Sequence, residues 1–419
     1  MVHEHSAAGS GLEHGFPRSA GRPVRLPAVF VRGGTSKALL LHERDLAGFD
    51  AAQREAIILA ALGSPDPYGR QIDGLGGGIS STSKVGIIGG PTPDGFITFA
   101  FGQVDVERPI VEFRGTCGNI SAAIGPFAVD EGLVPAVEPI TRVPVLSTTS
   151  GQRFIAHVPV AGGRARSEGE YEIDGVPGTG ARIGLEFLEP GGSLGRGLLP
   201  TGQPRQTLRL GDGRHIEVSL VDAANPLVLV RAEAIDADAT LSPEALERDR
   251  RVFETLEEIR ALAAVALGLA SSVQDACERV RATPKVAMVA PPARYTTTRG
   301  RILEADQVDL VARMLSMSRV HRTYALTAAI ATAVAAAVPE TVAWQVCRPG
   351  ATTRDVRIGH PAGTIEVGAT VTWRHGAWQA ERAMAYRTAR RIMDGWIEVP
   401  ETYLRGEAWF QRAKQEVRA

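Results

Sequence analysis

Apolar and polar residues follow two different periods along this chain, and the pattern predicts strands and helices in turn. Residues 24–32 and 38–42 are mostly apolar and flank a glycine-containing turn, which is typical of two paired strands. Residues 47–63 repeat apolar side chains at helical spacing and end at a glycine, which predicts a helix. Three more strands are predicted at 85–89, 96–106 and 109–114.

The second half of the chain repeats this order of elements. A hairpin is predicted at 205–222, a long amphipathic helix at 242–268 and a strand at 285–292, and further strands close the chain. In each half, one helix of small and apolar residues follows strands, at 119–132 and at 325–338. We therefore predict a pseudo-duplicated fold of two lobes with a cleft between them.

The boundary between the lobes is predicted in the glycine-rich stretch 161–202. The first lobe then covers 24–205 and the second 206–419, with the option that the last segment packs back on the first lobe. Two lobes also suit the length of 419 residues, since domains usually have ~100–200 residues. Residues 1–23 lack the basic and apolar regions of a signal peptide and are predicted to form a mobile tail.

Charge and composition argue against several classes of binding partner. Forty-six basic residues against forty-seven acidic ones leave a net charge of −1, so neither nucleic acid nor an anionic membrane is an expected partner. The most apolar segment, 325–338, is shorter than the ~20 residues of a membrane-spanning helix. The three cysteines have no CxxC spacing, which argues against a disulfide framework and against a structural zinc site. A cytoplasmic protein that binds a small molecule is the expectation.

Cys117 is the first candidate for chemistry. It lies between Gly115 and Gly118, where a strand gives way to the predicted helix, and Asn119 is a natural residue for a helix start. A buried, inert thiol is the ordinary role of a free cysteine. At a helix N-terminus, however, free N–H groups and the helix dipole favour a thiolate or a bound carboxylate. We therefore predict a functional cysteine.

Lys84 is the second candidate. It follows a glycine-rich loop that ends in four hydroxyl residues, and it precedes an apolar strand. A loop lysine in water is the ordinary alternative. A lysine entering a buried strand would instead be desolvated, which lowers its pKa and allows it to act as a neutral base. The four hydroxyl residues are Ser80, Ser81, Thr82 and Ser83.

Other polar residues have weaker signals. The segment 32–37 reads RGGTSK but lacks Walker spacing, so its Arg32 and Lys37 are candidates for holding carboxylates and not for a phosphate loop. The run GLGGG at 74–78 lacks the GxGxxG frame, which argues against a nicotinamide cofactor. His321 and His360 are candidates for substrate contact, although a lone histidine is more often a satisfied structural residue.

Five motifs in order give the chain a family resemblance: RGGTSK, GSPDPYGRQIDG, SSTSK, GTCGN and GHPAGT. Together they resemble the PrpF family of isomerases, from about residue 24 to residue 400. The resemblance implies an α+β fold like that of diaminopimelate epimerase. In this fold two similar lobes each have a curved, mostly antiparallel sheet wrapped round a central helix, and the active site lies in the cleft between the lobes.

The resemblance also implies a reaction. Members of the family shift a C=C bond by proton transfer, in an allylic 1,3-shift or a cis-trans isomerisation, without metal or organic cofactor. The catalytic lysine and cysteine of the family fall on Lys84 and Cys117. A tricarboxylate like 2-methylaconitate is the favoured substrate, and 4-oxalomesaconate, aconitate and methylitaconate are the alternatives within the family.

The residues suggest one division of roles. Neutral Lys84 would remove a proton, Cys117 would return one to the other carbon, and the backbone N–H groups of Gly118 and Asn119 would stabilise the charged intermediate. The opposite assignment of acid and base stays open. The remaining carboxylates of the substrate would be held by Arg32, Lys37, Ser80, Ser81, Thr82 and Ser83. From the second lobe, Met317, His321 and His360 would complete the substrate pocket.

Two other classes of function compete with an isomerase. A non-catalytic protein could bind a polycarboxylate or assist an aconitase-type enzyme, and Cys117 could be a nucleophile in acyl transfer. Oligomeric state is not readable from the chain, and a homodimer is one option.

Overall fold

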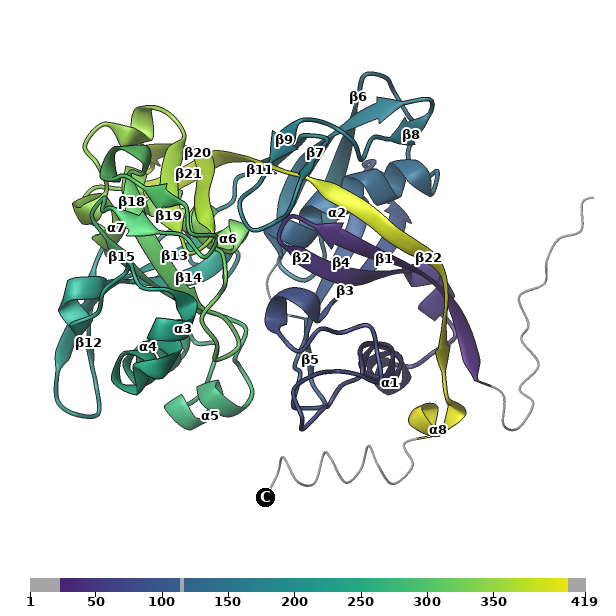
Figure 1. The fold of residues 1–419 in the computed structure, drawn as a ribbon, viewed down its shortest axis with the longest axis horizontal. Helices are drawn as coiled ribbons and strands as arrows, with labels where there is room; N and C mark the ends of the chain where they lie inside the picture. The colour runs from purple at the N-terminus through teal and green to yellow at the C-terminus, as the bar shows by residue number, and fades with distance from the viewer. Residues whose placement is uncertain (1–22, 114–116, 406–419) are drawn as a thin grey trace, which may run out of the picture.

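Two lobes lie side by side in the computed structural model, which describes residues 23–113 and 117–405 (Figure 1). The tail predicted at 1–23 lies outside the described residues, except for Pro23.

The first lobe is a curved sheet with a helix on each face. β1 and β2 form the predicted hairpin, β2 runs parallel to β3, and β3 pairs antiparallel with β4. β4 is parallel to β6, and β6 is antiparallel to β7. The elements are β1 (Val24–Gly33), β2 (Ser36–His42), α1 (Ala51–Leu62), β3 (Lys84–Pro91), β4 (Ile97–Val104), β5 (Val111–Glu112), α2 (Gly118–Asp130), β6 (Ile140–Ser147), β7 (Arg153–Ala161), β8 (Arg164–Ala165), β9 (Tyr171–Glu172), β10 (Thr179–Gly180) and β11 (Ile183–Leu188).

The second lobe repeats these pairings. β13 and β14 are antiparallel, β14 is parallel to β15, and β15 is antiparallel to β18. β18 is parallel to β19, and β19 is antiparallel to β20. The elements are β12 (Gln206–Arg209), β13 (His215–Ala223), β14 (Asn225–Arg231), α3 (Pro243–Arg248), α4 (Arg250–Ala266), α5 (Val273–Glu278), β15 (Lys285–Ala290), β16 (Tyr295–Thr296), β17 (Ile302–Leu303), β18 (Leu310–Leu315), α6 (Leu326–Ala337), α7 (Val342–Val346), β19 (Val356–His360), β20 (Gly363–Arg374), β21 (Ala377–Arg387), β22 (Ala389–Val399) and α8 (Glu401–Leu404).

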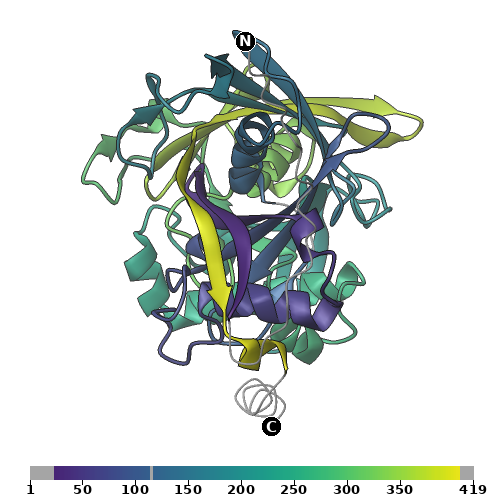
Figure 2. The same ribbon diagram turned by 90° about the vertical axis from the view of Figure 1, so that its right-hand side faces the viewer.

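Side chains alternate between the two faces of β1, which explains why each face of the sheet packs against a helix. In β1, Leu26 and Phe30 pack with α1, whereas Val29 and Val31 pack with α2 in the largest core. α6 belongs to this same core, and its residues 326–336 are all buried. Figure 2 shows both central helices enclosed by curved sheets. The predicted α+β fold, in which each lobe has a sheet curved round a central helix, is confirmed.

The last strands join the lobes. β21 pairs with both β20 and β11, and β22 returns to pair with β1 along its full length. Figure 1 shows β22 in yellow crossing from the second lobe to the far side of the first. The strand β22 near the C-terminus therefore packs on the first lobe.

Two predicted elements differ in the structure. The helix predicted at 242–268 is broken into α3 and α4, because Asp249 leaves helical geometry and its side chain accepts a hydrogen bond from the N–H of Val252. This local bond offers the backbone an alternative to a continuous helix. The strand predicted at 109–114 is reduced to the two residues of β5, and its last residue lies outside the described part of the chain.

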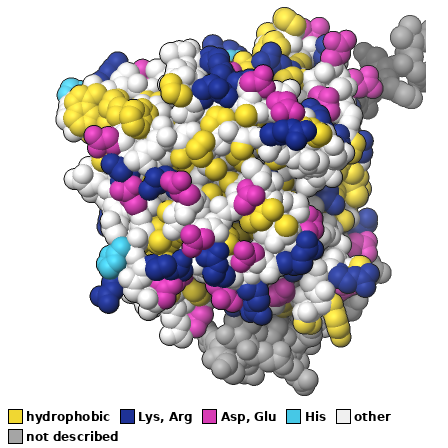
Figure 3. Space-filling model, turned by 60° about the vertical axis from the view of Figure 1, so that its left-hand side comes forward, with side chains coloured by type: hydrophobic (Ala, Val, Ile, Leu, Met, Phe, Trp, Pro, Cys, Tyr) yellow, Lys and Arg dark blue, Asp and Glu magenta, His cyan; other side chains and the backbone are white. Residues whose placement is uncertain are grey.

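The surface agrees with the balanced composition. On the face shown in Figure 3, acidic and basic side chains are interspersed and are not gathered by sign. Within residues 23–113 and 117–405, no helix has both the length and the apolar character needed to cross a bilayer.

Candidate active site

A small pocket lies where the two lobes meet. Its volume is about 30 Å³, and the first residues of β3, α2, β15 and α6 all line it. Lys84 and Cys117 from the first lobe are thereby brought together with Lys285 and His321 from the second. The full lining is Ser36, Lys84, Phe101, Gln103, Cys117, Gly118, Asn119, Asn225, Ala282, Thr283, Lys285, Ser316, His321, Ala325, Leu326 and Thr327.

Lys84 is held as a buried amine. Only 7% of the residue is exposed, and its Nζ donates a 2.5 Å hydrogen bond to Oε1 of Gln103, which lies opposite it in the β3–β4 register. The Gln103 amide nitrogen in turn donates to the carbonyl oxygens of Ser80 and Ser83. Burial lowers the pKa of Lys84 below its ordinary value, and the nearby Cys117 partly opposes this effect. Burial therefore favours the neutral amine of Lys84 more than water does.

The hydroxyl loop before Lys84 is fixed by Gln71. The Oε1 of Gln71 accepts hydrogen bonds from the Ser83 hydroxyl and from the N–H of Gly78. Ser83 also donates to the Ile79 carbonyl, as does the Thr82 hydroxyl. Ser81 belongs with Thr82 to the single 3-10 turn that precedes β3. The hydroxyl groups of Thr82 and Ser83 therefore shape the loop that aims Lys84, and none of residues 80–83 lines the small pocket.

Two helices begin at the pocket without side-chain caps. Cys117 is the N-cap of α2 and Ala325 is the N-cap of α6, and neither side chain accepts a hydrogen bond from its helix. The two helix starts touch, since a Cβ on Gly118 would lie 2.8 Å from Cβ of Leu326. Uncapped N–H groups and the positive ends of two helix dipoles converge on one small volume, which favours bound carboxylates.

The second lobe supplies another lysine. The Nζ of Lys285 donates to the Ala282 carbonyl at 3.2 Å and contacts the Ser316 hydroxyl at 3.4 Å. Burial and the neighbouring charge of Lys84 lower the pKa of Lys285 to about 8, although Cys117 and Glu112 oppose the shift. At neutral pH, Lys285 is therefore mostly a cation that faces the pocket.

His321 is a neutral member of the pocket. Burial and the charges of Lys285 and Lys84 lower the pKa of His321 to about 4. Its Nδ1 accepts a 3.2 Å hydrogen bond from the N–H of Thr323, which orients the ring.

Two buried polar atoms in the pocket have no hydrogen-bond partner among the described residues. They are Oδ1 of Asn225 and Oγ1 of Thr283. Buried polar atoms are usually satisfied, so unpartnered ones at a pocket mark it as a place for a polar ligand.

Several predicted site residues lie elsewhere. The Arg32 guanidinium donates to the backbone oxygens of Gly34 and Thr388, and Lys37 places its Nζ 5.5 Å from the centre of the Phe30 ring. His360 is buried beside a different cavity, where its Nδ1 accepts from the N–H of Ala362. None of these three residues lines the small pocket.

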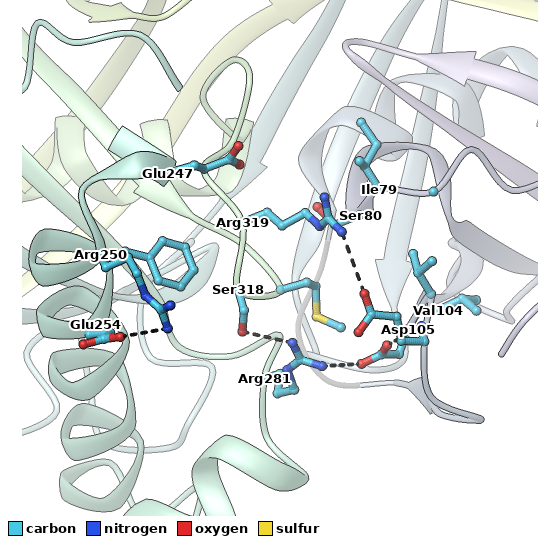
Figure 4. Close-up of a pocket in the computed structure, with 15 residues that line it drawn as sticks. Ile79, Ser80, Val104, Asp105, Glu247, Arg250, Glu254, Arg281, Ser318 and Arg319 are labelled. Carbon is cyan, nitrogen blue, oxygen red and sulfur yellow. Dashed lines mark hydrogen bonds and ion pairs between the residues drawn. The ribbon is translucent and has the colours of Figure 1, made fainter. Parts of the chain in front are cut away.

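Ser80 and Met317 line a larger, open cleft between the lobes. Its volume is about 600 Å³, and it adjoins the small pocket along the chain, because Met317 follows Ser316. Figure 4 shows an ion pair at its base, where Arg281 of the second lobe lies 2.9 Å from Asp105 of the first and donates to the Ser318 hydroxyl. The two walls of this cleft are thus joined by an ion pair between the lobes.

Gln103, Lys285 and Asn225 are pocket residues that the sequence prediction did not include. Lys285 carries a signal that could have found it, because it opens an apolar strand in the same way as Lys84. The chain has only four lysines, at 37, 84, 285 and 414, so two such positions are unusual. Gln103 and Asn225 are recognisable only after strand register is known.

Comparisons with known proteins agree across the chain. The sequence model of the family described as "PrpF protein" matches residues 23–400. The 3-methylitaconate isomerase of Eubacterium barkeri is 42% identical over 383 residues, which cover 91% of this chain and 99% of that protein. The 2-methyl-aconitate isomerase of Cupriavidus necator is 37% identical over 392 residues, with 90% and 98% covered. A crystal structure of methylitaconate-delta-isomerase has a TM-score of 0.73 at 41% identity and covers 93% of this chain and 99% of its own.

Proposed function

Because the chain belongs to the PrpF family and is an isomerase, we propose that it moves a carbon–carbon double bond in a small unsaturated polycarboxylate, using Lys84 and Cys117 as proton carriers. The observation that carries this proposal is the meeting of a buried lysine of lowered pKa with a cysteine at an uncapped helix start. Related isomerases of 3-methylitaconate and 2-methylaconitate support the reaction class.

The proposed proton path uses Lys84 and Cys117 in turn. Neutral Lys84 removes a proton from an allylic carbon, and the electron pair moves into the conjugated carboxylate as a dienolate. The free N–H groups of Gly118 and Asn119 stabilise the added charge, and one such donor typically lowers a barrier by ~3 kcal/mol. The Cys117 thiol then protonates the other allylic carbon. The proton held on Lys84 returns to the Cys117 thiolate, which resets both groups, and their position in the lining of one small pocket supports this transfer.

The carboxylates of the substrate would bind at the two helix starts and at Lys285. Each helix start offers backbone N–H groups to one carboxylate, and the Lys285 cation adds a charge-assisted bond. A tricarboxylate like 2-methylaconitate uses all three positions and is our first candidate.

A dicarboxylate like methylitaconate is the second candidate. The relative that acts on 3-methylitaconate is 42% identical, against 37% for the relative that acts on 2-methylaconitate. In addition, Arg32 and Lys37, which could have served an additional carboxylate, point away from the pocket.

Either acid requires the lobes to separate. A volume of about 30 Å³ holds only two or three water molecules, since one water needs about 10–15 Å³. We therefore take the structure as the closed state, and the Asp105–Arg281 ion pair in the outer cleft as one of the contacts that must break for entry.

The test is proton NMR in D2O with 2-methylaconitate and 3-methylitaconate as separate substrates. The protein should convert at least one of them and exchange its allylic protons for deuterium. Lys84→Ala and Cys117→Ser should each remove turnover while the circular dichroism spectrum stays unchanged. A protein that binds these acids without exchanging carbon-bound protons would be a binding protein, and the proposal would be lost.

A further inference from the structure

A second cavity lies between the lobes, apart from the catalytic pocket. Its volume is about 260 Å³, and none of its lining residues lines the catalytic pocket. It lies where β9 of the first lobe faces β20 of the second, and Figure 1 shows these elements at the junction of the lobes. The lining is Thr35, Tyr171, Glu172, Ile173, Asp174, Arg301, Thr323, Tyr324, His360, Thr364, Ile365, Glu366 and Arg387.

A line of hydrogen bonds forms the wall between the two spaces. His321 of the catalytic pocket accepts from Thr323, whose hydroxyl lies 3.1 Å from the hydroxyl of Thr35. Thr35 accepts a 3.0 Å bond from Nδ2 of Asn119, at the start of α2. This polar wall keeps the second cavity separate and gives it hydroxyl groups on one side.

Arg387 is a buried cation at the cavity. Only 6% of the residue is exposed, and it makes two hydrogen bonds, from Nε to Oδ1 of Asn119 and from Nη1 to the carbonyl of Tyr386. In the described part of the chain, Arg387 has no ion pair, and its Nη2 makes no hydrogen bond. Burial lowers the pKa of Arg387 to about 10, which still leaves the group charged at neutral pH.

A buried charge without a counter-ion is costly, because it has lost its water and gained no opposite charge. The proposed isomerase reaction does not use Arg387. The cavity beside Arg387 has room for a small anion, and a planar guanidinium with a free edge matches the two oxygens of a carboxylate.

The remaining lining restricts the ligand to one negative charge. Three acidic residues stand around the cavity. Asp174 is already paired with Arg301 at 3.0 Å and accepts from the N–H of Thr364, whereas Glu172 and Glu366 are exposed. A second carboxylate near these groups would be repelled, and a neutral or cationic end would not.

We propose that this cavity is a binding site for a small monocarboxylate, whose oxygens pair with Arg387 and whose other end is neutral or cationic. The ligand class differs from the polycarboxylates of the catalytic pocket. Because residues of both lobes line the cavity, an occupied site joins the lobes by one more set of contacts.

The first test is calorimetric titration with propionate, with its neutral isostere propionamide as the comparison. Propionate should bind the wild-type protein and propionamide should not. Arg387→Gln should weaken propionate binding at least tenfold, whereas Arg387→Lys should weaken it less. Arg299→Gln is the matched control, because Arg299 is exposed and outside the cavity, and it should bind propionate as the wild type does.

A double variant distinguishes propionate bound at Arg387 from propionate bound at the two lysines of the catalytic pocket. In Lys84→Gln/Lys285→Gln, propionate binding that depends on Arg387 should persist. If binding is lost in this double variant and kept in Arg387→Gln, the carboxylate sits in the catalytic pocket and the proposal is overturned. Failure of the isomerase proposal would instead appear as absent proton exchange, which leaves this titration unchanged.

A second measurement needs no variant. Crystals of the wild-type protein soaked in bromide should show an anomalous peak beside the Arg387 guanidinium, and propionate should displace it. The absence of a bromide peak at Arg387, or a peak that propionate leaves in place, contradicts the proposal even if Arg387→Gln fails to fold.

Discussion

The two lobes place the same kinds of residue at the same topological positions, yet only the first lobe has a thiol at the start of its central helix. Lys84 begins β3 and Lys285 begins β15, and both strands are flanked by one parallel and one antiparallel neighbour. Cys117 occupies the N-cap position of α2, whereas Ala325 occupies the equivalent position at α6. The duplicated backbone therefore builds a nearly symmetric pocket, and side chains alone make it asymmetric.

The partners of the two lysines also differ. Lys84 bonds to Gln103 in the neighbouring strand at 2.5 Å, whereas Lys285 meets Ser316, the residue directly after the corresponding strand β18, at 3.4 Å. Lys285 is also partly exposed, whereas Lys84 is buried. We infer that the first lobe supplies the proton carriers and the second lobe supplies a binding charge.

Replacing each lysine by glutamine tests whether the two lobes have different roles, and Lys84→Gln has the largest expected effect. Lys84→Gln removes the proposed base and should lower kcat by about 10³-fold, within the range of general acid–base catalysis. The steady-state rate of double-bond migration measures the effect, with Arg299→Gln as the surface control. Activity of Lys84→Gln within tenfold of the wild type would remove Lys84 from the proton path.

Lys285→Gln should act on binding instead. Loss of one charge-assisted bond to a carboxylate costs about 1.5–3 kcal/mol, so KM should rise about 10–100-fold while kcat changes little. A fall in kcat marks a lysine that carries protons, whereas a rise in KM at unchanged kcat marks a lysine that binds a carboxylate. If kcat falls as strongly in Lys285→Gln as in Lys84→Gln, then both lysines carry protons and the lobes are functionally equivalent.

The sequence predicted the parts of the fold that depend on local pattern. The helix ending at Gly63 is α1, and Gly63 has a φ of 69°, which a glycine adopts without strain. Both central helices were predicted because small and apolar residues fill most positions of a helix that is enclosed on nearly all sides. The break at Asp249 was missed because a side-chain cap within an amphipathic pattern looks like an ordinary exposed acid.

The pocket was predictable only where its lining residues lie in distinctive local motifs. Lys84, Cys117, Gly118 and Asn119 line one pocket and lie in such motifs, whereas His321, which also lines it, had only a weak signal. Arg32 and Lys37 had the right chemistry, but strand register directs their side chains away from the pocket, and register is set by contacts distant in sequence. Gln103 reaches Lys84 for the same reason.

Ala325→Ser tests whether the start of α6 binds the substrate. A serine at this N-cap can accept a hydrogen bond from the first turn of α6, which typically stabilises a protein by about 1 kcal/mol. The same bond occupies an N–H group that the proposed substrate needs. Stability measured in urea should rise, and KM should rise roughly two- to fivefold. A rise in stability with unchanged KM would mean that the start of α6 does not bind the substrate.

The smallest expected effect is a pH dependence of stability that belongs to Lys285. Its pKa is about 8 in the folded protein and near the ordinary value of about 10.4 in the unfolded chain, so the unfolded chain binds more protons between these values. Raising the pH from 8 to 9 should therefore stabilise the wild type relative to Lys285→Gln, by about 1 kcal/mol. Urea unfolding of both proteins at the two pH values measures the difference. Equal changes in both proteins would show that Lys285 titrates normally, and the second lobe would then hold its lysine in water and not in the pocket.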